Sequence, residues 1–188
     1  MLQTSQFNVQ APWNGVGVKS GANDVEQAMK DARLDFDVEV TDSFHRLDDG
    51  SFVNAGDDKF IRRTDTKQIL GRCGKVWRPL QNRDAFKFFQ PFLDKQLARI
   101  DTVGSLNGGR KVWILAELNR EPSTIVKGDQ VAKFILLMNG HDGGTSIRGG
   151  FTPFRLSCAN QMPMLNESIA RGASQIIRIR HSGDVRQT

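Results

Sequence analysis

Two short stretches contain residue types whose spacing could support chemistry. The first, GSLNGGRKVW at residues 104–113, has two glycines separated by four residues and then two cations, as in a phosphate-binding loop. Such a loop needs a lysine and a hydroxyl residue where this chain has Arg110 and Lys111, and it opens into a helix. Residues 111–118 alternate like a strand instead. The stretch therefore predicts a β-hairpin, with positive φ angles in its turn at residues 107–109.

The second stretch, NGHDGG at residues 139–144, contains a His-Asp doublet like that of metal-dependent phosphohydrolases. Those enzymes need further distant His and Asp ligands, and this chain has three histidines and two cysteines without metal-ligand spacing. An aspartate in a glycine-flanked turn also has a structural use, because it stabilises the turn geometry. Common nucleophile motifs are absent as well. We predict no catalytic residue, metal or cofactor, and the role of His141 and Asp142 stays open between structure and catalysis.

A third pattern recurs along the chain: a basic residue beside an aromatic residue or a glycine turn. Lysine and arginine contact phosphates, and indoles stack on unpaired bases. If Val112 and Ile114 face the core, Lys111 and Trp113 face solvent; the alternative for any strand tryptophan is the core. We predict nucleic-acid contacts at fourteen positions: Lys59, Arg62, Arg63, Arg72, Lys75, Trp77, Arg78, Arg110, Lys111, Trp113, Arg148, Arg155, Arg178 and Arg180.

The charges are segregated along the chain, which has a net charge of +5. Residues 31–58 hold nine acidic residues and two arginines, and residues 59–120 hold fourteen lysines and arginines against five acidic residues. The two segments therefore carry −7 and +9. This segregation indicates a polyanion partner for the middle of the chain. Equally, the acidic segment could pack beside the basic one, or meet the basic face of a neighbouring subunit.

The elements that must position these residues are strands and a few helices. We expect an irregular arm over residues 1–22 and then a core over 23–188. The core starts with a helix capped by Asn23 or Asp24 and continues with an acidic strand at 35–44 and two strands within 58–81. A helical segment over 82–97, capped by Asn82, carries the apolar stripe Phe86, Phe89, Phe92 or Leu93, and Leu97. Pro91 kinks this segment or starts a second helix.

After the hairpin we expect a loop at 121–129, a buried strand at 130–138 and a strand from 145. A helical tail from about residue 156 and a basic end at 175–182 follow. These patterns predict an α+β fold: a mainly antiparallel β-sheet with helices packed on one face, in a single domain. Because residues 183–188 form no convincing element, we expect a disordered C-terminal extension that is missing from the sequence.

The composition excludes several classes of protein. The chain has 188 residues, 38% hydrophobic and 25% charged, and no apolar run long enough for a membrane helix. The N-terminus lacks the features of a signal peptide, so we expect a cytoplasmic protein that contacts no membrane. Cys73 and Cys158 are then expected to be reduced and structural.

Five ordered motifs give the chain a resemblance to a known family. PWNGVG, the Asn-led helix, GSLNGGRKVW, NGHDGG and TPFRLSCAN together resemble the uncharacterised phage/plasmid-like protein family of mobile elements. The matching residues are Pro12, Trp13, Gly15, Gly17, Asn82, Gly104, Leu106, Gly109, Arg110, His141, Asp142, Gly143, Arg155, Cys158, Asn160 and His181. The resemblance spans nearly the whole chain and implies a phage or plasmid origin.

A more distant resemblance concerns architecture alone. The order of helix, hairpin, strands and helix in a basic domain is similar to single-strand annealing recombinases of the Redβ, RecT and Erf type. It implies ATP-independent binding and annealing of single-stranded DNA in homologous recombination, by a homo-oligomeric ring or filament. A partner exonuclease or single-strand binding protein would accompany it. The alternatives are a metal-dependent nuclease or nucleotide hydrolase centred on His141 and Asp142, and a modulator of host defence that binds protein through its acidic segment.

Overall fold

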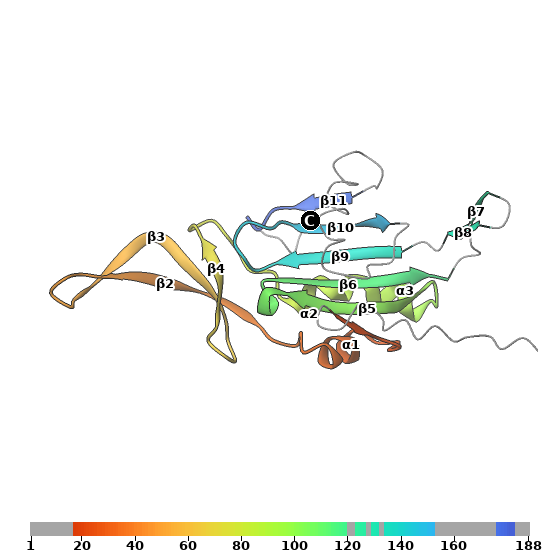
Figure 1. Cartoon of the computed structure of the whole chain (residues 1–188), viewed down its shortest axis with the longest axis horizontal. Coiled ribbons are helices and arrows are strands. Elements are labelled where there is room, and N and C mark those ends of the chain that lie inside the picture. The colour runs from red at the N-terminus through yellow and green to blue at the C-terminus, as the bar shows by residue number, and fades with distance from the viewer. Residues whose placement is uncertain (1–16, 120–122, 127–128, 132–133, 153–175, 183–188) are drawn as a thin grey trace, which may run out of the picture.

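A six-stranded antiparallel sheet, the main sheet, forms the body of the protein (Figure 1). The computed structural model describes residues 17–119, 123–126, 129–131, 134–152 and 176–182. The strand order is β1-β5-β6-β9-β10-β11. The strands are β1 (Gly17–Lys19), β5 (Ala98–Leu106), β6 (Lys111–Leu118), β9 (Phe134–Gly140), β10 (Ile147–Thr152) and β11 (Ile176–Ile179). Residues 1–22 were predicted as an irregular arm. Within them, Gly17–Lys19 form the strand β1, because they pair with β5.

The hairpin predicted at residues 104–113 is confirmed. β5 pairs with β6, and a 3₁₀ turn (Asn107–Gly109) joins them. Asn107, Gly108 and Gly109 have φ angles of 53°, 69° and 101°. A side chain at Gly109 would place its Cβ 2.8 Å from the Phe36 ring, so this position requires glycine for both its backbone and its space.

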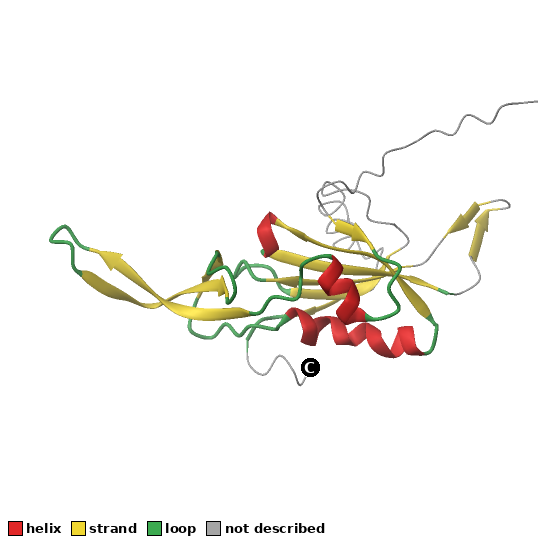
Figure 2. Cartoon of the chain, turned by 90° about the horizontal axis from the view of Figure 1, so that it is seen from below, coloured by secondary structure: helices red, strands yellow, loops and turns green. Residues whose placement is uncertain are grey.

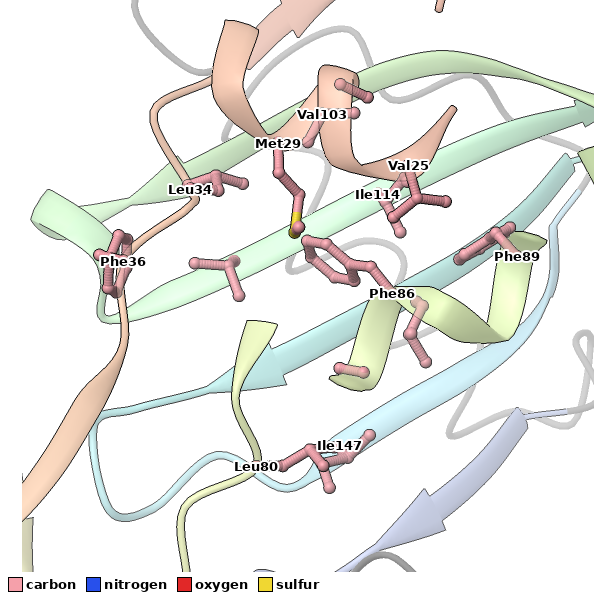
Figure 3. Close-up of a cluster of buried hydrophobic side chains, with 14 of the residues drawn as sticks. Val25, Met29, Leu34, Phe36, Leu80, Phe86, Phe89, Val103, Ile114 and Ile147 are labelled. Atoms are coloured by element: carbon pink, nitrogen blue, oxygen red, sulfur yellow. The ribbon is translucent and has the colours of Figure 1, made fainter. Parts of the chain in front are cut away.

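The helices cover one face of the main sheet, as predicted. They are α1 (Val25–Asp31), α2 (Asn82–Phe86), a 3₁₀ turn (Lys87–Phe89) and α3 (Gln90–Asp94), which begins beside Pro91. Asp24 caps α1 by accepting hydrogen bonds from the backbone N–H groups of Glu26 and Gln27. Phe86 and Phe89 lie against Val103 and Ile114 of the sheet in one buried cluster (Figure 3).

Two details of the helical segment differ from the prediction. Gln81, not Asn82, occupies the N-cap position of α2, and Asn82 is buried. Leu97 is 47% exposed, because the helix ends at Asp94 and Leu97 lies in the turn that leads into β5. The apolar stripe is therefore formed by Phe86, Phe89 and Leu93.

The prediction that Trp113 faces solvent is wrong: this residue is 2% exposed. Val112, Ile114 and Ala116 face the helices, as expected, but the opposite face of β6 is packed as well. Trp113 and Leu115 join Phe134, Leu136 and Met138 in a second apolar cluster. β6 is a central strand, and the Trp113 ring covers Gly17 of β1, where an added Cβ would lie 2.8 Å from the indole.

A separate three-stranded sheet, the arm sheet, extends from the body. It consists of β2 (Val38–Arg46), β3 (Phe52–Arg63) and β4 (Ile69–Cys73), and β2 and β3 form a long ribbon that projects away from the main sheet (Figures 1 and 2). The strands were predicted, but not their separation from the main sheet. A small hairpin of β7 (Ser123–Val126) and β8 (Asp129–Val131) occupies the predicted loop.

The fold class is confirmed: the chain is α+β, mainly antiparallel, with helices on one face in a single domain. The predicted helical tail, Arg155 and Cys158 lie outside the described residues. In the described part of the chain, no helix is long and apolar enough to cross a membrane.

Candidate nucleic-acid interface

Most cations of the arm sheet are paired with carboxylates of the same sheet. β2, which is rich in acids, lies antiparallel to β3, which is rich in cations, so that Glu39 faces Arg62 and Asp42 faces Lys59. The Arg62–Glu39 distance is 2.8 Å, and Lys67 also contacts Glu39, at 3.3 Å. The remaining pairs are Lys59–Asp42, Arg63–Asp65 and Lys75–Asp57. The sequence-level charge segregation is therefore largely neutralised within this sheet.

Two further predicted cations have local partners. The Arg72 guanidinium lies 5.5 Å from the centre of the Phe60 ring. Arg110 donates from Nε to the carbonyl of Leu70, and its own carbonyl accepts from the backbone N–H of His141. Arg110 therefore joins the hairpin to β4 and to the turn after β9.

The main sheet carries a second group of cations, which we call the basic face: Lys111, Arg148, Arg178 and Arg180. Arg148 of β10 pairs in register with Arg178 of β11, and also with Met138, which lies opposite Trp113. The side chains of Lys111, Arg148 and Arg178 therefore lie on the sheet face opposite the helices, and Arg180 follows directly after β11. Burial lowers the pKa of the Arg148 guanidinium, and the charge of Arg178 lowers it further. Two like charges at facing positions favour an anion between them.

The cations of the basic face differ in their acidic partners, and the charge of Asp142 acts on Arg148. Within the described residues, Arg178 and Arg180 are exposed and form no ion pair with a carboxylate. Lys111 lies 3.7 Å from Asp142, at the limit of an ion pair. Arg178 and Arg180 thus leave exposed positive charge beside the basic side of the main sheet.

Trp77 is not a free stacking platform. It is 7% exposed, and its ring stacks on His181 with centroids 4.9 Å apart. His181 donates from Nδ1 to the carbonyl of Arg78, 3.1 Å away, and the backbone N–H of Arg78 donates to the carbonyl of His181. These contacts bring the end of the Arg178–Arg180 segment against residues 77–78.

A cleft of about 250 Å³ lies beside this stack. Val40, Trp77 and Pro79 give it apolar walls, and three cations line it: Lys59, Lys75 and Arg78. Arg78 also donates to the carbonyls of Lys75 and Trp77. The tertiary structure therefore collects four of the fourteen predicted residues at one cleft, although Lys59 and Lys75 keep their carboxylate partners.

His141 is a buried structural residue in the turn after β9. It is fully buried, and its Nε2 lies 2.8 Å from Oδ1 of Asn82. Because the Asn82 amide donates to the carbonyl of Leu34, Oδ1 accepts and the imidazole donates. Burial lowers the pKa of His141 to about 3, with a smaller contribution from His181. A neutral imidazole without solvent access is poorly suited to acid–base chemistry.

Asp142 organises the same turn. Its carboxylate accepts hydrogen bonds from Gly144 N–H, Thr145 N–H and the Thr145 hydroxyl. Burial raises the pKa of Asp142, but these hydrogen bonds and Lys111 outweigh it, so that the pKa lies below its usual value. The neighbouring Gly143 has a φ of 81°, and an added Cβ would lie 1.7 Å from the Arg72 carbonyl. The turn is thus the place where the main sheet meets β4 of the arm sheet.

The motif residues of the chain converge on this junction. Asn82, Arg110, His141 and Gly143 link the helices, the hairpin, the turn and β4. Sequence reasoning missed the contact between Asn82 and His141, because nothing local to either residue signals a partner 59 positions away.

Cys73 of β4 is a free thiol, and burial raises its pKa. No group of three His, Cys, Asp or Glu side chains able to hold a metal occurs in the described ranges.

Comparisons with known proteins give one match. A family model described as a domain of unknown function, DUF932, matches residues 69–188. The match begins at β4 and includes the main sheet from β5 onwards, but leaves out β2 and β3. No curated protein and no solved structure matches the chain.

Proposed function

Because the chain belongs to the DUF932 family, whose description gives no activity, we propose a function from its own surface: ATP-independent binding and annealing of single-stranded DNA. The proposal follows from the distribution of cations. The observation that carries it is the pair of exposed arginines Arg178 and Arg180, which form no ion pair with a carboxylate within the described residues and lie beside Arg148, the register partner of Arg178.

A phosphate backbone fits this arrangement. Arg178 lies in β11 and Arg180 follows directly after the strand ends at Ile179, so in extended backbone the two side chains point to one side, roughly 7 Å apart. That spacing is close to the distance between successive phosphates of an extended single strand, and it allows each arginine its own phosphate. Arg148 lies beside them at the register position of Arg178. Contacts of this kind bind the backbone without regard to base sequence.

The cleft beside Trp77 extends the proposed path. His181 follows Arg180 directly and stacks on Trp77, so a strand that leaves β11 meets Arg78 and Lys75 next. The apolar cleft walls offer a place for one base, while its cations remain near the backbone. Stacking on Trp113 is not part of the proposal, because this ring is buried.

The test is a binding titration with a labelled single-stranded oligonucleotide over a salt series. We expect the double variant Arg178→Ala/Arg180→Ala to weaken binding on the order of tenfold at low salt. The slope of log affinity against log salt should fall by about 1.4, the value for two lost single-strand phosphate contacts. The matched control, Arg62→Ala/Lys67→Ala, also removes two positive charges, but both belong to the Glu39 ion pairs. It should change affinity less than twofold.

Two results would contradict the proposal. Binding that does not depend on salt, or no binding at low salt, removes the electrostatic contact. An equal loss in both double variants means that net charge alone, not the basic face, determines affinity. Annealing is measured separately with complementary strands, and ATP should leave its rate unchanged. An origin in a phage or plasmid recombination system is the accompanying hypothesis, and it depends on the sequence resemblance.

The rival hydrolase has less support from the geometry. A hydrolase centred on His141 and Asp142 needs both side chains to reach substrate or metal. His141 is fully buried, and the Asp142 carboxylate accepts hydrogen bonds from Thr145 within the turn. A metal-dependent cleavage activity that is lost in both His141→Gln and Asp142→Asn would reverse this ranking.

A further inference from the structure

The ribbon of β2 and β3 has a tip that lies far from the main sheet. We call residues 42–58 the arm; it extends away from the main sheet in both views (Figures 1 and 2). Its turn is well formed, because Leu47 N–H donates to Ser51 O and Asp49 accepts from both the backbone N–H and the hydroxyl of Ser51. The arm is thus an ordered projection with its own internal hydrogen bonds.

Both faces of the arm expose large apolar side chains. Phe44 faces Asn54 and Arg46 faces Phe52, so the two phenylalanines lie diagonally on one face; they are 55% and 68% exposed. Val53 lies on the other face, and Leu47 lies at the turn; both are about half exposed. A two-stranded ribbon is marginally stable alone in water, and exposed apolar clusters mark contact surfaces. The arm therefore has the features of a segment that packs against a partner.

The charge of the arm selects the partner. Residues 42–58 hold five acidic residues and one arginine; because Asp42 and Asp57 pair with Lys59 and Lys75, the arm keeps a net charge of −2, whereas the chain as a whole carries +5. Two arms would repel each other, so a two-fold contact between arms is disfavoured. The body of a second copy attracts the arm, because its charge is opposite.

The body has an exposed apolar site at the end of the main sheet. Ile177 of β11 is 71% exposed and faces Gly149 of β10, and Phe151 of β10, 53% exposed, lies on the same sheet face. This is the face of the helices, opposite Arg148 and Arg178. A contact there leaves the basic face open.

We propose that the arm of one copy packs on Phe151 and Ile177 of a second copy, so that the chain assembles head to tail. The two surfaces of this contact are different, and such contacts produce rings or open filaments rather than closed two-fold dimers. Each added copy presents its own basic face, which would give an extended track for one strand. The contact itself does not depend on nucleic-acid binding.

The test measures the mass of the protein without nucleic acid, by sedimentation or light scattering over a concentration series. The parent chain should form species larger than a dimer. Phe44→Asp/Phe52→Asp should be monomeric, and so should Ile177→Asp. Phe88→Asp is the matched control, because Phe88 is 54% exposed but lies in the 3₁₀ turn between α2 and α3, and it should assemble as the parent does. Circular dichroism verifies that each variant is folded.

Mixing the two monomeric variants gives the sharpest result. Phe44→Asp/Phe52→Asp keeps an intact Ile177 surface, and Ile177→Asp keeps an intact arm. Together they can form a single native contact. An equimolar mixture should yield dimers and nothing larger. A mixture that stays monomeric, a parent that is monomeric at every concentration, or an arm variant that assembles normally would each overturn the proposal. Because no DNA is present, these outcomes are separate from failure of the proposed function.

Discussion

The two sheets of this protein contrast in how they use their side chains. The main sheet is packed on both faces, with Ile114 toward the helices and Trp113 in a cluster on the other side. Beside it, Arg178 and Arg180 are exposed and form no ion pair with a carboxylate within the described residues. The arm sheet pairs most of its cations with carboxylates but exposes Phe44 and Phe52. The contrast shows that a cluster of cations in the sequence does not reveal how many of them are free of ion pairs in the folded protein.

The largest expected effect tests whether the main sheet alone carries the core. Trp113→Ala should lower the free energy of unfolding by about 3–5 kcal/mol, because it removes a buried indole and leaves a cavity. Phe52→Ala in the arm should change it by less than about 0.5 kcal/mol, since that ring is mostly exposed. Chemical denaturation measures both. Similar changes in the free energy of unfolding for the two variants would contradict the view that the main sheet is packed on both faces while the arm is exposed.

The next effect tests the junction between the sheets. Gly143→Ala should cost about 3 kcal/mol, because the new Cβ collides with the Arg72 carbonyl and the φ angle is positive. Gly144→Ala is the matched control: an added Cβ there meets nothing within 4 Å, so the cost should stay within about 0.5 kcal/mol. Equal stabilities would mean that β4 and the turn are not tightly joined.

A smaller effect at the same junction depends on pH. The pKa of His141 is about 3 in the folded protein and about 6.5 in the unfolded chain, so between these values only the unfolded chain takes up the proton. The free energy of unfolding should fall by roughly 2 kcal/mol between pH 7 and pH 5 from this residue alone. His181, whose pKa is also lowered by burial, acts in the same direction. His141→Gln should remove the larger part of the slope; an unchanged slope would refute the assignment.

The smallest effect sharpens the comparison of charge. Glu39 has a lowered pKa because it accepts hydrogen bonds from Arg62 and Lys67. Glu39→Gln should release both cations and raise single-strand affinity roughly twofold at low salt. Asp49→Asn changes the net charge equally but releases no cation, because Asp49 binds Ser51. If both variants bind DNA equally well, the ion pairs with Glu39 do not keep Arg62 and Lys67 from binding DNA.

Local signals predicted a large part of this fold. The hairpin turn and α1 with its cap at Asp24 follow from rules that act over a few residues, and they were confirmed. The errors lie where distant segments meet. Asn82 has the residue type of a helix cap, but its amide is used by His141 and Leu34 instead. Trp113 alternates correctly with Ile114, but alternation cannot tell whether the second face of a strand is also covered.

The sequence by itself determined the fold class, the turn at residues 107–109 and the presence of many cations, because composition and short-range periodicity carry that information. The tertiary structure decided which cations are neutralised. Glu39 and Arg62 are 23 residues apart and meet only because β2 and β3 pair in one register, whereas Arg148 and Arg178 face each other across β10 and β11. Coulomb attraction depends on distances of a few ångströms, and strand pairing sets those distances.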